Sequence, residues 1–291
     1  MLYLILSILS FTIIVLLFKL LAKYKVNTFH AIVYNYMTAA ILGFIISGQN
    51  TTIAEVTHAY WFPNAIIIGA SFIFLFYLIA ITAQKVSVTV SIVANKMSVV
   101  IPVMFAFFLY DDSITLLKVA GIILALTGVV LASMKEKAIG VVDKRYIYLP
   151  LLLFLGSGLL DTYIKYSQQF FVKEGEILIF IPSLFAVAAI SGFIILLSRL
   201  LISPAKFQIK NVAWGLLIGF FNYASIYFLL KTLELKGFES SVVFPLNNMG
   251  IVIAAAVSAF ILFKEKLTQQ NWIGILLSVI AIAMIAFSSS G

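Results

Sequence analysis

Charged and amide side chains occur inside long apolar stretches of this sequence, where their burial is costly and makes them candidates for function. Lys96 is the deepest of the charges, because it lies nine residues after Ser87, about 14 Å along a predicted helix. That depth is near the middle of a bilayer core, from which a lysine side chain reaches the headgroups poorly. Two interpretations stay open: Lys96 faces a substrate, or it forms a structural ion pair with Asp161.

Further charges lie on the predicted first and sixth helices. Asp161 and Lys165 are four residues apart, so they share one face of a helix. They either neutralise each other locally or exchange partners, or a proton, during a transport cycle. Lys19 occupies the matching position in the first half of the chain, 146 residues before Lys165. Both lysines are predicted to be interfacial anchors, with a coupling or gating role as the alternative.

Asparagines line up with other polar residues on the predicted fourth and ninth helices. In the fourth, polar residues and a proline recur every three or four positions and form one stripe, made of Ser87, Ser91, Asn95, Ser98 and Pro102. In the ninth, Asn247 and Asn248 follow Pro245, a residue that frees a backbone carbonyl one turn back. Buried amides either join helices or bind a ligand. We expect Asn95 and Asn248 to approach each other near a pseudo-two-fold axis.

Aromatic and amide groups from two other segments complete the candidate substrate site. Tyr34 and Asn35 lie in the second predicted helix, and Asn222 and Tyr223 lie in the eighth. Beside the cation of Lys96, these groups suit a small zwitterionic or aromatic metabolite whose carboxylate faces the lysine. The alternative for the tyrosines is a place in the aromatic belt at the membrane interface.

The composition excludes a soluble domain and argues against an enzyme. Hydrophobic residues make up 63% of the 291 residues and charged residues 10%, whereas a soluble domain is about half apolar and a quarter charged. The chain has no cysteine for a thiolate metal site, and two histidines are too few for an imidazole cluster. We therefore expect no catalytic residue, cofactor or metal. The basic residues behind the net charge of +8 are scattered singly, which does not suggest nucleic acid.

Ten apolar segments, each of about 20 residues, predict ten membrane-spanning helices. Charges, prolines and polar clusters delimit them at residues 2–22, 29–47, 62–84, 87–109, 116–134, 147–167, 177–202, 212–231, 238–262 and 270–288. None of them alternates with the period of two that a strand of a membrane barrel requires. We predict an all-α membrane protein with ten transmembrane helices, in which residues 1–291 form a single transmembrane domain.

The sequence repeats itself in two halves. Ala39–Ile46 reads AAILGFII and Ala188–Ile195 reads AAISGFII, so the two differ at one position in eight. Glycines and polar residues extend the match at offsets of 146 to 153 residues, for example Gly69 with Gly219, Thr82 with Thr232, and Asn95 with Asn248. Because each half holds five helices, an odd number, residues 1–140 and 141–291 are predicted to be inverted repeats, as in many secondary transporters.

A hairpin pattern occurs once in each half: an acid, a threonine three residues later and a glycine six residues after that. Its members are Asp112, Thr115 and Gly121, and then Glu265, Thr268 and Gly274. With ten predicted helices in two halves, the chain resembles the drug/metabolite transporter superfamily, in particular its EamA-like branch, over essentially its whole length. The resemblance implies a carrier of small metabolites, often amino acids, with its fifth and tenth helices outside the main cavity. Where the family often has glycine before the acid, this chain has Asp111 and Lys264.

These observations predict a secondary active transporter, an exporter of small polar metabolites such as amino acids, that works by alternating access. A cationic-drug exporter is one alternative, but Met1–Ala22 contains no acid and a central lysine repels cations. A non-transporting membrane scaffold is the other, although it would avoid the cost of burying Lys96. The expected partners are a small-molecule substrate and membrane lipids. Proton coupling, and the choice between a monomer and a homodimer, stay open.

Lysines and arginines between the helices predict the orientation of this multi-pass protein in the cell (inner) membrane. Twelve of them lie in odd-numbered connections and four in even-numbered ones. The charge bias therefore places the odd connections in the cytoplasm and both termini outside, whereas eukaryotic members of the family typically keep their termini in the cytosol. A C-terminal fluorescent fusion that fluoresces only in the cytoplasm would contradict the charge-based prediction.

Overall fold

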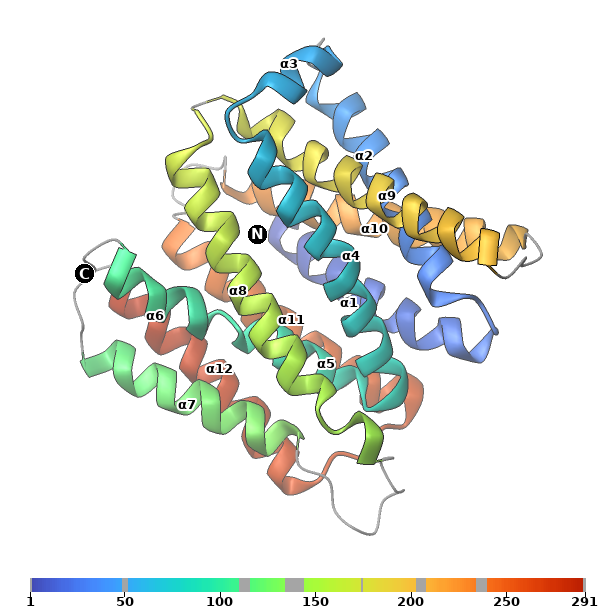
Figure 1. Ribbon diagram of the computed structural model, residues 1–291. Helices are drawn as coiled ribbons and strands as arrows, with labels where there is room; N and C mark the ends of the chain where they lie inside the picture. Colours follow the sequence, from blue (N-terminus) through green and yellow to red (C-terminus); the bar gives the residue numbers. More distant parts are fainter. Residues whose placement is uncertain are drawn as a thin grey trace. The chain divides into compact units, whose positions relative to one another are not determined.

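The computed structural model describes residues 2–48, 52–109, 116–133, 144–173, 175–202, 208–233 and 240–289. These residues are helical apart from short connections, and no strand occurs among them (Figure 1). The helices are α1 (Leu2–Lys23), α2 (Thr28–Ser47), α3 (Ile53–His58), α4 (Phe62–Lys85), α5 (Val88–Met97), α6 (Val100–Leu109), α7 (Leu116–Ser133), α8 (Leu149–Phe170), α9 (Ile177–Ile202), α10 (Ile209–Leu233), α11 (Ser240–Phe263) and α12 (Gln269–Ser289), with a short 3₁₀ helix at Lys144–Tyr146. The predicted all-α class is confirmed for the described part of the chain.

Most of the predicted segments coincide with one helix each. Six of the described helices are long and apolar enough to cross a membrane by their length and composition: α1, α2, α4, α9, α10 and α11. Large apolar side chains on these helices face outward, among them Ile45 and Leu262, which are 69% and 64% exposed. Such surfaces are stable in lipid and not in water. The chain is a multi-pass membrane protein.

The fourth predicted segment, at 87–109, is not one helix but two, because α5 and α6 are interrupted at Ser98. Pro102 explains the interruption: it has no N–H to donate to the Ser98 carbonyl, and its ring crowds that carbonyl. The Ser98 carbonyl accepts the Ile101 N–H at 2.9 Å instead, and the Ser98 hydroxyl donates to the Asn95 carbonyl at 2.5 Å. The prediction of a continuous helix was wrong here, and Pro102 was the signal against it.

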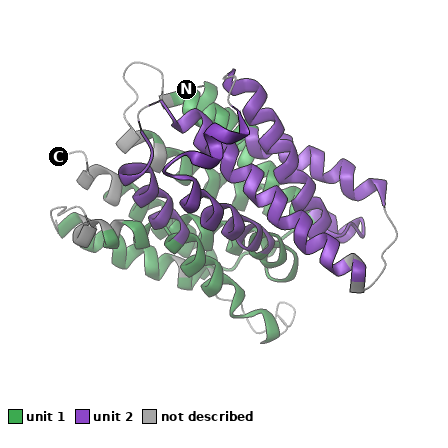
Figure 2. Ribbon diagram, turned by 45° about the horizontal axis from the view of Figure 1, so that its top comes forward, with its two compact units in different colours: residues 1–19, 78–159, 224–291 green, residues 20–77, 160–223 purple. Residues whose placement is uncertain are grey.

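The chain divides into two compact units, green and purple in Figure 2. Unit 1 comprises Met1–Lys19, Leu78–Leu159 and Ala224–Gly291, and unit 2 comprises Leu20–Tyr77 and Leu160–Tyr223. Each unit therefore takes residues from both halves of the sequence. The compact units and the two sequence repeats are different divisions of the same chain.

Repeat-related helices pack directly on each other within both units. In unit 2, α2 packs on α9, the helices that contain the AAILGFII and AAISGFII segments. In unit 1, α5 packs on α11 and α7 on α12, and Figure 1 shows α7 and α12 side by side. The last pair is so close that a methyl group at Gly274 would lie 2.8 Å from the Gly128 carbonyl oxygen. Small residues thus bring repeat-related helices together, as is common in membrane proteins.

Candidate functional site

Lys96 lies in the last turn of α5, in unit 1, and its side chain is half-buried. Its ammonium nitrogen is 3.9 Å from the centroid of the Phe11 ring on α1, which is a cation–π contact. The carbonyl end of α5 carries a partial negative charge that also favours a cation in this turn. Because α5 ends at Met97, the charge lies at an interrupted helix, a feature that transporters use to bind ions and substrates.

Asn95, one residue earlier, joins α5 to α8. Its amide nitrogen donates to the Ser157 hydroxyl at 2.9 Å, and Ser157 is buried. One turn before it, the Ser91 hydroxyl donates to the Ile79 carbonyl of α4, also at 2.9 Å. The polar stripe predicted on this helix therefore holds neighbouring helices at two positions.

The amides of α11 belong to unit 1 as well. Asn247 is 6% exposed, and its side-chain oxygen has no hydrogen-bond partner among the described atoms. Asn248 is half-buried, and Pro245 lies in the second turn of α11 with its side chain outside the described residues. Although α11 packs against α5, the described side-chain hydrogen bond of Asn95 leads to Ser157. The approach of Asn95 and Asn248 stays a prediction.

In unit 2, Asn35 on α2 and Asn222 on α10 form a buried amide pair. The Asn222 amide nitrogen donates to the Asn35 side-chain oxygen at 3.1 Å, and the two residues are 0% and 4% exposed. The Asn35 amide nitrogen has no hydrogen-bond partner in the described part of the chain. A buried donor without an acceptor costs on the order of 1–3 kcal/mol. This donor is therefore available to a ligand oxygen or a water molecule.

Two glycines bring α10 close to α2 at this pair. A methyl group at Gly219 would lie 2.5 Å from the Asn35 carbonyl oxygen, and one at Gly215 would collide with the Tyr34 side chain. Any larger residue would push the helices apart. The close approach brings Asn222, three residues after Gly219, within hydrogen-bonding distance of Asn35.

Tyr34 and Tyr223, the aromatic members of the predicted site, are half-buried inside unit 2. The Tyr34 ring meets Phe193 of α9 edge to face, with 5.9 Å between the centroids. The Tyr223 ring lies beside Gly43 of α2, where an added methyl group would be 3.2 Å from it. These contacts serve helix packing, and a role for either tyrosine in substrate binding stays a prediction.

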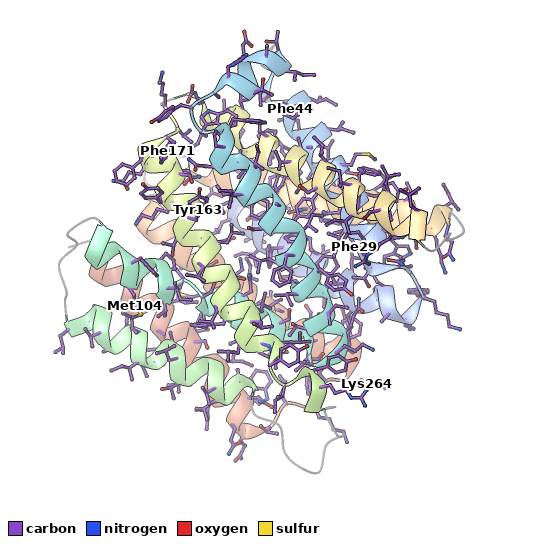
Figure 3. All side chains as sticks on the ribbon, in the orientation of Figure 1. Phe29, Phe44, Met104, Tyr163, Phe171 and Lys264 are labelled. Carbon is purple, nitrogen blue, oxygen red and sulfur yellow. The ribbon has the colours of Figure 1, made fainter. Side chains whose placement is uncertain are left out.

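Asp161 and Lys165 lie one turn apart on α8, and both side chains are exposed. Tyr163, labelled in Figure 3, lies between them in sequence, and its hydroxyl donates to the Asn64 side-chain oxygen on α4 at 2.7 Å. These residues belong to unit 2, whereas Lys96 belongs to unit 1. The expected Lys96–Asp161 ion pair stays a prediction.

A cluster around Glu265 was not singled out from the sequence. One Glu265 carboxylate oxygen accepts the Val88 backbone N–H at 2.9 Å and lies 3.9 Å from the Lys19 ammonium. The other accepts the hydroxyls of Ser87 at 2.7 Å and Thr89 at 3.3 Å. We call these five residues the Glu265 cluster. Lys19, predicted as an anchor or a gating residue, thus forms an ion pair, and the hairpin pattern was the only sequence signal that pointed to Glu265.

A metal site in a protein needs several histidine, cysteine or acidic side chains around one point. Among the described residues, no group of three or more histidines, cysteines and acids is placed to hold a metal ion. The paired acids Asp111 and Asp112 lie outside the described residues.

Residues 1–134 match the family model of the EamA-like transporter family. An uncharacterized protein of Haemophilus influenzae is 22% identical over 284 residues, which cover 96% of this chain and 95% of that protein. A solved crystal structure aligns with a TM-score of 0.60 and 16% sequence identity, over 98% of this chain and 97% of that one. At this identity the structural likeness shows the fold alone. The resemblance to the EamA-like branch of the drug/metabolite transporter superfamily is confirmed.

Proposed function

With residues 1–134 matched to the EamA-like transporter family, we propose that this chain is a secondary active transporter that exports small polar metabolites, such as amino acids, by alternating access. The observation that carries the proposal is the position of Lys96. Its charge lies at the end of an interrupted helix, next to the Asn95–Ser157 hydrogen bond. A substrate carboxylate would bind to this charge, and a charged hydrogen bond there contributes roughly 1.5–3 kcal/mol.

The unpaired polar atoms of the two units suggest the substrate class. Unit 2 holds an unpaired amide donor, the Asn35 nitrogen, and unit 1 holds an unpaired amide acceptor, the Asn247 oxygen. Buried groups of this kind gain most from a ligand that completes their hydrogen bonds. In unit 1, the Lys96 ammonium suits a carboxylate, and the Asn247 oxygen suits a donor such as an ammonium group. A small zwitterionic metabolite carries both of these groups and therefore matches unit 1 best.

Alternating access in such carriers rests on two inverted repeats, and two contacts in unit 2 support that arrangement. A methyl group at Gly219 would lie 2.5 Å from the Asn35 carbonyl oxygen, and one at Gly69 would lie 2.7 Å from the Leu184 carbonyl oxygen. The two glycines are 150 residues apart, and the two carbonyls are 149 residues apart. Matched contacts at matched offsets are what duplicated five-helix halves would produce. We place the protein in the cell (inner) membrane and assign it no catalytic step.

The test begins with a thermal-shift screen of the purified protein against amino acids and other metabolites, which selects the substrate. That substrate is then followed in proteoliposomes with Lys96→Met, a change that installs the residue found 153 positions later, Met249. Transport should fall at least about tenfold, because a charged contact is lost. The purified variant should stay monodisperse, since replacing a buried ion by an apolar group is often neutral or stabilising. Lys173→Met, which removes an exposed charge, is the matched control and should transport normally.

Two outcomes would change the assignment. If expression of Lys96→Met collapses and Asp161→Asn restores it in the double variant, Lys96 serves a structural ion pair. If a well-expressed Lys96→Met protein transports as the wild type does, Lys96 is not in the substrate site. A wild-type protein that moves no metabolite in liposomes and co-purifies with one partner would favour the scaffold.

A further inference from the structure

The Glu265 cluster joins three segments of unit 1 at one carboxylate. Glu265 lies in the turn between α11 and α12, Lys19 lies near the end of α1, and Ser87 is the N-cap residue of α5. The Glu265 side chain is 11% exposed and the Lys19 side chain 26%. The contacts between them are therefore largely shielded from water, where charge-assisted hydrogen bonds are strongest.

The carboxylate completes the start of α5. A helix begins with backbone N–H groups that have no partner within the helix. Ser87 accepts one of them, the Val90 N–H, at 3.3 Å, and Glu265 accepts another, the Val88 N–H, at 2.9 Å. A negative charge at this end also interacts favourably with the helix dipole. The start of α5 thus depends on a residue that lies 177 positions away from Val88 in the chain.

The hydrogen bonds hold this carboxylate more tightly than the ion pair does. Ser87 and Val88 donate to it at 2.7 and 2.9 Å, whereas the Lys19 nitrogen is 3.9 Å away, beyond hydrogen-bonding distance. A charge at that distance balances the carboxylate but adds little directional restraint. Removing the charge of Glu265 should therefore affect α5 much more than removing the charge of Lys19.

The turn before α12 is shaped to present Glu265. Lys264, labelled in Figure 3, adopts a left-handed backbone conformation with φ of 51°, which side chains disfavour and glycine accepts. The next backbone N–H, that of Glu265, donates to the Ala259 carbonyl of α11 at 3.2 Å. The turn is therefore closed onto the end of α11, and a lysine stands where the family often has glycine.

The position of α5 decides where the candidate substrate residues lie. Lys96 is eight residues after Val88, about 12 Å along the helix axis, and α5 ends one residue later. Because the helix is interrupted at Ser98, α5 is a short separate helix, and the Glu265 cluster holds its start. Near its other end, Asn95 is held by Ser157. If the start of α5 shifts, the helix tilts and Lys96 near its other end moves with it.

We propose that Glu265 is a positioning residue, which holds the start of α5 and thereby places Lys96 to bind the substrate. The part that concerns the substrate rests on the proposed function. A neutral residue at position 265 would let α5 sample arrangements in which Lys96 is misplaced. The apparent substrate affinity would then fall in proportion to the fraction of protein molecules in which Lys96 is correctly placed. Saturating substrate would select those molecules and restore the transport rate.

The first experiment measures the start of α5 without any transport. The chain has no cysteine, so an introduced cysteine is its single thiol. Val90→Cys is a suitable reporter, because Val90 is 4% exposed and its side chain is not part of the Glu265 cluster. We expect N-ethylmaleimide to label it at least about tenfold faster in the Glu265→Gln background, since tenfold corresponds to a stabilisation of about 1.4 kcal/mol, close to the lower end of the range for a charged hydrogen bond.

Val33→Cys on α2, in unit 2, is the matched control, because Val33 is also fully buried. Its labelling rate should be the same with Glu265 and with Glu265→Gln. Equal rates for Val90→Cys in the two backgrounds would overturn the proposal. Faster labelling of both cysteines would also overturn it, because Glu265 would then stabilise the whole fold and not the start of α5.

The second experiment is substrate transport in proteoliposomes. Glu265→Gln should raise KM about tenfold with the maximal rate nearly unchanged, and substrate should slow the labelling of Val90→Cys in that background. Glu265→Asp, which keeps the charge, should recover most of the affinity, and Lys19→Met should change KM less than about threefold. A lower maximal rate with unchanged KM would indicate a merely structural role and overturn the proposal. If the wild type transports nothing, the proposed function fails, whereas the labelling experiment still decides whether Glu265 holds α5.

Discussion

The α2–α10 contact and the α4–α9 contact of unit 2 share a backbone arrangement but not their side chains. Where α10 carries Asn222, α4 carries Phe72 at the equivalent position, 150 residues earlier. Where α2 carries Asn35, α9 carries Leu184, 149 residues later. One contact therefore contains a buried amide pair, and the other contains apolar groups at both places.

The apolar contact is closed by aromatic rings. Phe72 stacks on Tyr36 with ring centroids 6.1 Å apart and planes 2° from parallel, and the Tyr36 hydroxyl donates to the Phe72 carbonyl at 3.0 Å. Phe185, the repeat mate of Tyr36, lies 5.9 Å from Tyr36 and 6.0 Å from Phe72. The other contact leaves the Asn35 amide nitrogen without a partner. Both contacts place a glycine against a backbone carbonyl, where no side chain fits, whereas the side chains beside the glycines differ.

The largest effect is expected from the glycines that both contacts share. Gly219→Leu and Gly69→Leu should each destabilise the protein by roughly 1–3 kcal/mol or more, because the new side chain would be forced against a carbonyl of the facing helix. Little monodisperse protein should survive purification, which size-exclusion chromatography and thermal unfolding in detergent would measure. Ala213→Leu on α10 and Ala70→Leu on α4 are the matched controls, since both alanines are exposed. Tolerance of Gly219→Leu alone would show that the two contacts are not equivalent.

A smaller effect should separate the amide pair from the aromatic contact. Asn222→Leu removes the donor to the buried Asn35 side-chain oxygen and should cost on the order of 1–3 kcal/mol in thermal unfolding experiments. The double variant Asn35→Leu and Asn222→Leu should recover most of that stability, because no buried polar group is then left unpaired. Under the proposed function, both variants should lose transport of the zwitterionic substrate.

Tyr36→Phe is the control on the aromatic side. It removes the hydroxyl bond to the Phe72 carbonyl, so it should cost about 0.5–1.5 kcal/mol and leave KM unchanged. Full transport by the doubly substituted amide variant would refute a ligand role for Asn35 and Asn222 and leave them a purely structural one.

The smallest effect is expected for Thr38→Val, which gives α2 the residue that α9 carries at Val187. The Thr38 hydroxyl donates to the Tyr34 carbonyl at 2.8 Å within its own helix, so it does not link helices. Stability should stay within about 0.5 kcal/mol and transport should be unaffected. A large loss would mean that the polar difference between the two contacts extends beyond the amide pair.

The sequence by itself determined the local structure and the class of protein. Apolar length placed nine of the ten predicted segments on single helices, and the two similar octets lie on α2 and α9, which pack on each other. Two further features were readable. Pro102 was a signal for the interruption after α5 that the prediction of one helix overlooked, and Thr52 with Glu55 forms a capping box that starts α3, a short helix outside the ten predicted segments. These features are determined by residues that are close together in the chain, and they can therefore be predicted from the sequence.

Only the tertiary structure decided which polar groups meet. Asn222 bonds to Asn35, 187 positions away, and Asn95 bonds to Ser157, 62 positions away. Lys264 takes a left-handed backbone conformation that its residue type does not suggest. Helical periodicity predicts which residues share one face of a helix. Which other helix packs against that face depends on where glycines and helix interruptions allow two helices to approach. The carboxylate that holds the start of α5 could therefore be recognised only once the turn before α12 had been placed against it.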